Sequence, residues 1–187
     1  MTDLDPMGRD ERPSPAAALA ALRAGHARFR AGAAVLPVAS GSPAVASGPL
    51  AAVFACADPH QPEPGPLFGG SELLTVRTAG LGIGPAVLGS LEYAVAHLRL
   101  PLILVLGHES CRLPGGGGHE RVRAAAATLR HRSALLDAAV RAGRCAIHGM
   151  CWHDPERVLR SVRRTEPPSA PRPPRLRPRA SRTAQAH

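Results

Sequence analysis

The stretch PLILVLGHESC (Pro101–Cys111) decides the fold. It opens with an unbroken run of aliphatic residues between a proline and a glycine, which is typical of a strand buried on both faces of a parallel sheet. The run predicts a strand over 101–108 and ends on His108, with Cys111 three residues later. The stretch therefore brings an imidazole and a thiol to the carboxyl end of a strand, where parallel sheets collect their functional groups.

Segments of the same kind recur along the chain and alternate with helical patterns. Three further apolar segments predict strands, at 50–58, 72–80 and 144–152. Helical periodicity, with proline at the start or glycine at the end, predicts helices over 15–32, 85–100 and 119–142. Because strands and helices alternate, the sequence predicts an α/β fold with a mainly parallel central β-sheet flanked by helices.

The distribution of charge separates a folded body from a basic tail. The formal net charge is +9, but residues 163–187 alone hold seven arginines against one acidic residue. This tail is rich in proline and lacks interleaved aromatic side chains that could stack on bases. We therefore expect a disordered N-terminus over 1–15, one folded domain over 16–162 and a disordered Pro/Arg-rich tail over 163–187. A nucleic-acid partner is not expected.

The sequence also carries expectations about location. It contains no run of about 18 apolar residues, so no membrane span is expected. The first residues, MTDLDPMGRDERPSP, are charged and lack the apolar region of a secretory signal. We therefore expect a cytoplasmic protein, whose four cysteines are thiols or metal ligands rather than disulfides.

Four candidate site residues lie at predicted strand ends. Cys56 and Asp58 close the 50–58 strand, His108 ends the 101–108 strand, and Cys111 follows it. Zinc prefers thiolate and imidazole ligands, and a catalytic zinc keeps three protein ligands with one open position. Taken singly, each residue has another interpretation: Cys56 suits a buried apolar position, and an isolated H-x-x-C pair is usually coincidental.

Four motifs taken together are more specific. The segments ACAD, VRTAG, SLEYAVAHL and LILVLGHESC follow one another in an order and spacing that resemble the β-class carbonic anhydrases. The similarity covers roughly residues 16–160. By this resemblance Cys56, His108 and Cys111 match zinc ligands. Asp58 matches an aspartate that accepts a hydrogen bond from zinc-bound water or itself takes the fourth zinc position.

The resemblance implies an activity and an assembly. It implies a Zn²⁺-dependent carbonic anhydrase that hydrates carbon dioxide reversibly to bicarbonate by zinc-bound hydroxide, because zinc lowers the pKa of bound water to about 7. It also implies a homodimer or higher homo-oligomer with the site near a subunit interface. The alternative is a catalytically weak or inactive zinc-binding pseudoenzyme of the same fold.

The sequence departs from the family pattern at two places. His60 stands where the family has an arginine that pairs with the aspartate, and histidine is charged only part of the time near neutral pH. We therefore expect Asp58 and His60 to be the catalytic pair, with Asp58 restrained less firmly. The second departure is RLPGGGG, which follows Cys111 directly and replaces the family's longer covering segment.

Two other features have weaker functional interpretations. Arg77 either holds the site by hydrogen bonding or is a surface or structural residue. Cys145, His148, Cys151 and His153 suggest a second metal cluster. Along a strand, however, Cys145 and His148 point to opposite faces. We therefore predict core thiols and edge histidines rather than ligands.

Overall fold

The computed structural model describes residues 12–33, 48–113 and 117–162. These residues form a five-stranded sheet of order β2-β1-β3-β4-β5, in which β5 alone runs antiparallel to its neighbour. The strands are β1 (Ala51–Cys56), β2 (Leu73–Thr78), β3 (Leu102–His108), β4 (Ala146–His153) and β5 (Val158–Val162). The predicted α/β class with a mainly parallel sheet is confirmed.

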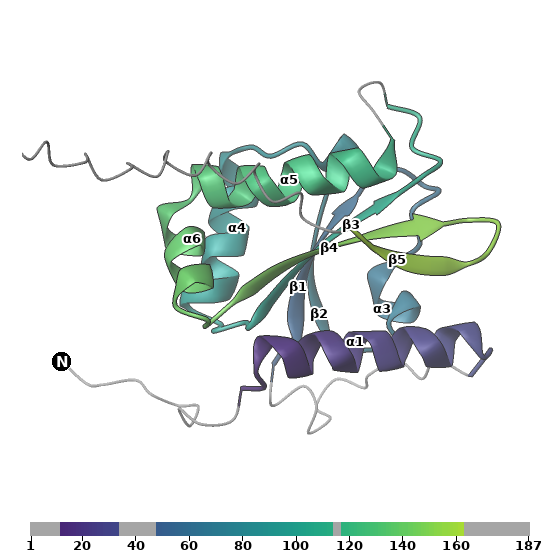
Figure 1. Ribbon diagram of the computed structural model, residues 1–187, viewed down its shortest axis with the longest axis horizontal. Helices are drawn as coiled ribbons and strands as arrows, with labels where there is room; N and C mark the ends of the chain where they lie inside the picture. The colour runs from purple at the N-terminus through teal and green to yellow at the C-terminus, as the bar shows by residue number, and fades with distance from the viewer. Residues whose placement is uncertain (1–11, 34–47, 114–116, 163–187) are drawn as a thin grey trace, which may run out of the picture.

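Helices cover both faces of this sheet (Figure 1). One face packs under α1 and α3, and the other under α4, α5 and α6, so the molecule has three layers and two apolar cores. The helices are α1 (Pro15–Arg30), α3 (Pro64–Leu67), α4 (Pro85–Ala96), α5 (Gly118–Arg132) and α6 (Ala134–Arg141), with a short 3₁₀ turn, η1 (Ala79–Leu81). Central strands β1 and β3 are buried along their whole length, as their aliphatic runs predict.

The single helix predicted over 119–142 is wrong, because it breaks at Ser133. This residue has an extended backbone, and its Oγ accepts a hydrogen bond from the N–H of Leu136 at 3.1 Å, so it caps the start of α6. The same hydroxyl donates to Glu92 of α4 at 2.6 Å. The local cap thus starts α6, and the hydrogen bond to Glu92 ties the break to α4.

Strand β5 was not predicted from the sequence. The turn that leads from β4 to β5 contains no glycine, although Arg157 within it has a φ of 51°, a conformation that favours glycine. The usual sequence signal for a hairpin is therefore missing. The short helix α3 was likewise not predicted.

Some predictions fall on residues outside the described ranges. These are the disorder predicted for residues 1–11 and for the 163–187 tail. The last residues of the predicted N-terminal segment are described: Ser14 caps α1, with its side chain accepting from the N–H of Ala17 at 3.2 Å. Among the helices that the structure describes, none has the length and apolar character needed to cross a membrane.

Buried His26 is expected to make the fold sensitive to acid. The N–H of Leu159 donates to His26 Nε2 at 3.3 Å, which leaves the ring proton on Nδ1, 3.3 Å from the carbonyl of Leu67. Burial lowers the pKa of His26 below 6.5. The ring therefore stays neutral in the folded state at a pH where it is protonated in the unfolded chain.

Because the folded state holds His26 neutral, its burial favours folding fully above about pH 6.5. This contribution to the free energy of unfolding is lost as the pH falls below that value. We expect the free energy of unfolding, measured by urea titration, to decrease between pH 7 and pH 5. In the variant His26→Gln the free energy of unfolding should depend less steeply on pH. The decrease in slope should correspond to up to about one fewer proton taken up on unfolding. Exposed His131 is the control, and an equal flattening in His131→Gln would contradict the assignment.

Candidate metal centre

Cys56, His108 and Cys111 lie together at the carboxyl edge of the sheet. Cys56 ends β1 and His108 ends the adjacent parallel strand β3, so the two side chains leave the sheet at the same edge. Cys111 returns to them from the turn that follows β3. The ligand atoms of all three residues lie within 4.8 Å of one another, and the structure thus brings together the predicted thiol–imidazole set.

The imidazole of His108 is held in one orientation by a chain of hydrogen bonds. Its Nδ1 lies 3.2 Å from Ser110 Oγ, which itself donates to Asp154 at 2.5 Å. The other oxygen of Asp154 accepts from the indole N–H of Trp152 at 2.6 Å. Because the Ser110 proton is already engaged, Nδ1 of His108 carries the ring proton. None of the three supporting residues was predicted from the sequence.

This orientation leaves His108 Nε2 as a ligand atom. The atom is buried and has no hydrogen-bond partner among the described residues, which is costly unless an ion or molecule occupies the space beside it. Burial lowers the pKa of His108, so the ring is neutral near pH 7, the form that binds metals. The residues present therefore fit a zinc ion.

The two thiols are adjacent to each other. Burial raises the pKa of the Cys111 thiol most, and the neighbouring Cys56 raises it further. The raised pKa keeps the Cys111 thiol protonated near neutral pH unless a metal cation binds beside it. Zinc binds cysteine as thiolate and would supply that charge.

Asp58 lies outside the three-residue cluster, and His60 holds its carboxylate. Oδ1 of Asp58 accepts the backbone N–H of His60 at 2.9 Å and its ring Nδ1 at 2.8 Å. These two hydrogen bonds lower the pKa of Asp58 to about 2, and the backbone hydrogen bond has the larger effect. The far nitrogen of His60 lies 3.3 Å from a guanidinium nitrogen of Arg112, a residue that the sequence analysis did not single out. His60 thus stands between Asp58 and an arginine.

Arg77 fastens the loop that carries Asp58. Its Nε donates to the carbonyl of Cys56 at 3.0 Å, and Nη2 donates to the carbonyls of Asp58 and Gln61 at 3.4 and 3.3 Å. Nη1 forms an ion pair with Glu63. Of the two interpretations of Arg77, the structure supports the one in which it holds the site by hydrogen bonding.

The first turn of α5 covers the cluster. The space beside the ligand atoms is only about 10 Å³, room for one ion or one water molecule. Gly118 closes it so tightly that a Cβ there would lie 2.3 Å from the carbonyl oxygen of His108. The lining residues are Cys56, Gly80, Leu81, Gly107, His108, Cys111, Gly118 and Arg121. Helix α5 thus supplies a cover that the sequence did not predict.

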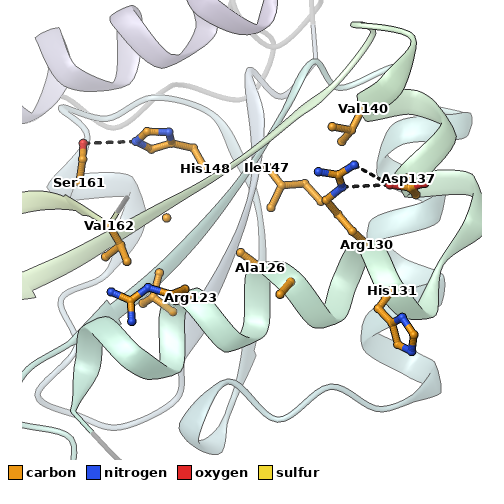
Figure 2. A pocket seen from close by; sticks show the side chains of 13 residues that line it. Arg123, Ala126, Arg130, His131, Asp137, Val140, Ile147, His148, Ser161 and Val162 are labelled. Carbon is orange, nitrogen blue, oxygen red and sulfur yellow. Dashed lines mark hydrogen bonds and ion pairs between the residues drawn. The ribbon is translucent and has the colours of Figure 1, made fainter. Parts of the chain in front are cut away.

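A larger cavity of about 920 Å³ lies elsewhere, between α5, α6 and the β4–β5 edge (Figure 2). Figure 2 shows the ion pair of Arg130 with Asp137 on one side and His148 beside Ser161 on the other. None of the three cluster residues lines this cavity, so it is separate from the metal centre.

The four residues considered as a second cluster divide into two pairs. Cys145 is a core thiol whose pKa burial raises to about 11, and His148 is bonded to Ser161 at 3.3 Å, as predicted for core thiols and edge histidines. Cys151 and His153 instead lie beside a residue from outside the predicted set, His119. Their spacing of two along a strand places both on one face, which was the available signal.

Gln61, in the loop that Arg77 holds, is expected to destabilise the fold. Its side chain is 2% exposed, and within the described ranges neither its amide nitrogen nor its oxygen has a hydrogen-bond partner. Replacing it with methionine, which has a similar volume, removes both unpaired groups. We expect Gln61→Met to raise the free energy of unfolding by about 1–3 kcal/mol in urea titration. A loss of stability would show that the amide has a partner in solution.

Comparison with known proteins bears on this site. A family model described as carbonic anhydrase matches residues 51–114, which include all three cluster residues. A carbonic anhydrase of Mycolicibacterium smegmatis is 46% identical over 104 residues, which cover 52% of this chain and 50% of that protein. Carbonic anhydrase 2 of Mycobacterium tuberculosis is 44% identical over the same length and shares. The chain thus spans about half the length of the curated relatives it matches.

The fold gives a matching result. A solved β-carbonic anhydrase of Sordaria macrospora, described as tetrameric, aligns with a TM-score of 0.55 over 79% of this chain and 94% of that one. The sequences are 17% identical, so this likeness concerns the fold alone. The resemblance to the β-class carbonic anhydrases that the sequence motifs indicated is confirmed.

Proposed function

We propose that the protein is a zinc-dependent carbonic anhydrase that converts carbon dioxide reversibly to bicarbonate. Cys56, His108 and Cys111 would hold the Zn²⁺ ion. The observation that carries the proposal is the buried Nε2 of His108, which has no hydrogen-bond partner within the described part of the chain. Ser110 orients the ring, and the ligand atoms of the two cysteines lie within 4.8 Å. The family match over the same residues supports it.

Zinc bound here would supply Lewis acidity and would lower the pKa of a coordinated water to about 7. The protein's own groups prepare the site for this chemistry. Asp58, with its pKa near 2, remains an acceptor at every physiological pH, and His60 orients its carboxylate. Leu81 and the glycines beside it form an apolar wall that suits an uncharged substrate, while Arg121 brings positive charge close to the thiols.

Other features of the proposal rest on the family. Asp58 would take the fourth zinc position in a closed arrangement, in which it leaves His60. The tetrameric relative supports a homodimer or higher homo-oligomer. We also place the protein in the cytoplasm.

A zinc-binding pseudoenzyme is the second candidate, and one observation favours it. The space of about 10 Å³ beside the ligand atoms holds an ion or a water molecule but not a substrate as well. Catalysis therefore requires the first turn of α5 to move. If this cover does not move, the protein binds zinc but does not hydrate carbon dioxide.

Stopped-flow carbon dioxide hydration at pH 8 to 9 tests the proposal. Full-length protein loaded with zinc is compared with the same protein stripped by a chelator. Turnover that needs zinc and returns when zinc is restored supports the enzyme. Stoichiometric zinc without turnover indicates the pseudoenzyme, and failure to retain zinc contradicts both.

His60 is expected to govern turnover through its hold on Asp58. In His60→Ala the carboxylate loses the bond from the imidazole, and the link to Arg112 is broken. Asp58 is then freer to approach the zinc, and we expect kcat at pH 8 to fall about 10-fold or more. The variant His60→Arg restores a donor and should recover most of the activity. Unchanged kcat in His60→Ala would exclude this role.

A further inference from the structure

We propose that His119, Cys151 and His153 form a second metal site, for zinc or another divalent transition ion that binds imidazole and thiolate. The ligand atoms of these three residues lie within 4.8 Å of one another. They share no residue with the Cys56–His108–Cys111 cluster. Two imidazoles and one thiolate suit zinc, and also Co²⁺ as a probe.

Two structural elements meet at this cluster. Cys151 and His153 occupy alternate positions near the end of β4, so their side chains share a face of the sheet. His119 lies in the first turn of α5 and approaches from above them. The contact is close, because a Cβ on neighbouring Gly118 would lie 2.7 Å from Cys151 Sγ.

The two imidazoles face each other through their Nε2 atoms, which are 3.0 Å apart. An ion bound tetrahedrally to both, at the usual 2.0–2.1 Å, places the two nitrogens about 3.3 Å apart. A small adjustment of His119, whose side chain is 37% exposed, is enough to reach that separation. Without an ion, one ring must donate its proton to the other.

Glu109 orients His153 for metal binding. One oxygen of Glu109 lies 2.8 Å from Nδ1 of His153, which is buried with 3% exposure. A carboxylate accepts only, so Nδ1 carries the proton and Nε2 presents its lone pair to the cluster. This carboxylate–histidine pairing is typical of metal ligands. The negative charges of Glu109 and Glu156, 2.8 and 3.9 Å from Nδ1, also offset the charge of a divalent ion.

An ion at this site would join the start of α5 to the end of β4. The same helical turn closes the Cys56–His108–Cys111 cluster through Gly118. The second ion would therefore fix the cover of the first site. The exposed side of His119 leaves a fourth position for water.

Metal content measures the two sites separately. Full-length protein is loaded with Zn²⁺, dialysed and analysed by mass spectrometry in four forms: wild type, Cys111→Ser, His119→Ala and the double variant. We expect about two ions per chain, then about one in each single variant and about none in the double. His131→Ala, which removes an exposed histidine from the far end of α5, is the matched control and should keep about two.

Two further measurements use Cys111→Ser, in which only the second site remains intact. Zinc should raise its melting temperature, and Co²⁺ should give it a thiolate-to-cobalt absorption band. Both effects should disappear on adding His119→Ala, whose partly exposed position lets the variant fold, as circular dichroism would verify. These results do not depend on whether the protein hydrates carbon dioxide.

The proposal is overturned if the wild type holds only about one ion and Cys111→Ser holds none. It is also overturned if His119→Ala keeps the same number of ions as its parent in both backgrounds. In that case any second ion lies elsewhere.

Discussion

Gly118→Ala is expected to destabilise the fold by about 3 kcal/mol, although it adds a single methyl group. The new Cβ would lie 2.3 Å from the carbonyl oxygen of His108 and 2.7 Å from Cys151 Sγ, far inside van der Waals contact. The carbonyl belongs to a buried central strand and cannot yield. The first turn of α5 must therefore move away from the sheet, which exposes the metal centre and separates His119 from β4.

Gly117→Ser is the matched control for this prediction. Nothing lies within 4 Å of a Cβ at Gly117, which is the N-cap of α5, where serine is a favoured residue. This variant should keep or slightly increase the free energy of unfolding in urea titration, while Gly118→Ala loses stability and zinc affinity together. Equal stability of the two variants would mean that α5 does not rest on β3 in solution.

Cys111→Ser is expected to abolish carbon dioxide hydration and to weaken zinc binding at the first cluster by about 100-fold or more. A structural zinc contributes on the order of 10 kcal/mol, so one ligand of three carries about 3 kcal/mol. Serine keeps the size of the side chain but does not ionise near neutral pH. The buried Nε2 of His108 and the thiolate of Cys56 alone do not hold the ion.

Competition titration with a chromophoric chelator measures the affinity, and stopped-flow hydration measures the rate. Cys145→Ser, which removes a buried thiol at the opposite end of β4, is the control and should retain both zinc and turnover. Turnover that survives in Cys111→Ser would place the catalytic metal elsewhere and would remove the basis of the proposed function.

The sequence predicted the four parallel strands from local signals, and the first cluster from strand ends together with the family resemblance. Buried strands are recognisable as aliphatic runs, and Cys56, His108 and Cys111 stand at the ends of two of them. The break at Ser133 was missed although serine is a local N-cap signal, because the residues around it continue the helical pattern. Its hydrogen bond to Glu92, 41 residues earlier, has no local signal. Strand β5 was missed because its turn uses Arg157 in place of glycine.

The parts of the site that escaped prediction are contacts between distant segments. Ser110 reaches Asp154 across 44 residues, and Arg112 reaches His60 across 52. Nothing in the local sequence distinguishes these residues from other polar residues, because only the folded chain brings them together. His119 is a further example, because its contact with His153 depends on the position of α5 relative to β4. The strand ends and the family resemblance therefore indicated the candidate ligands, but not the groups that orient them.

The contacts between α1 and β5 bear on the order in which the molecule assembles. Leu159 bonds His26 across 133 residues, and Arg23 donates to Ser161 at 3.1 Å across 138. Closing so long a loop costs chain entropy that is repaid only once the intervening sheet exists. We therefore expect this junction to form after the folding barrier and to open first. A stronger junction would then slow unfolding, and so lengthen the lifetime of the native state, without changing the folding rate.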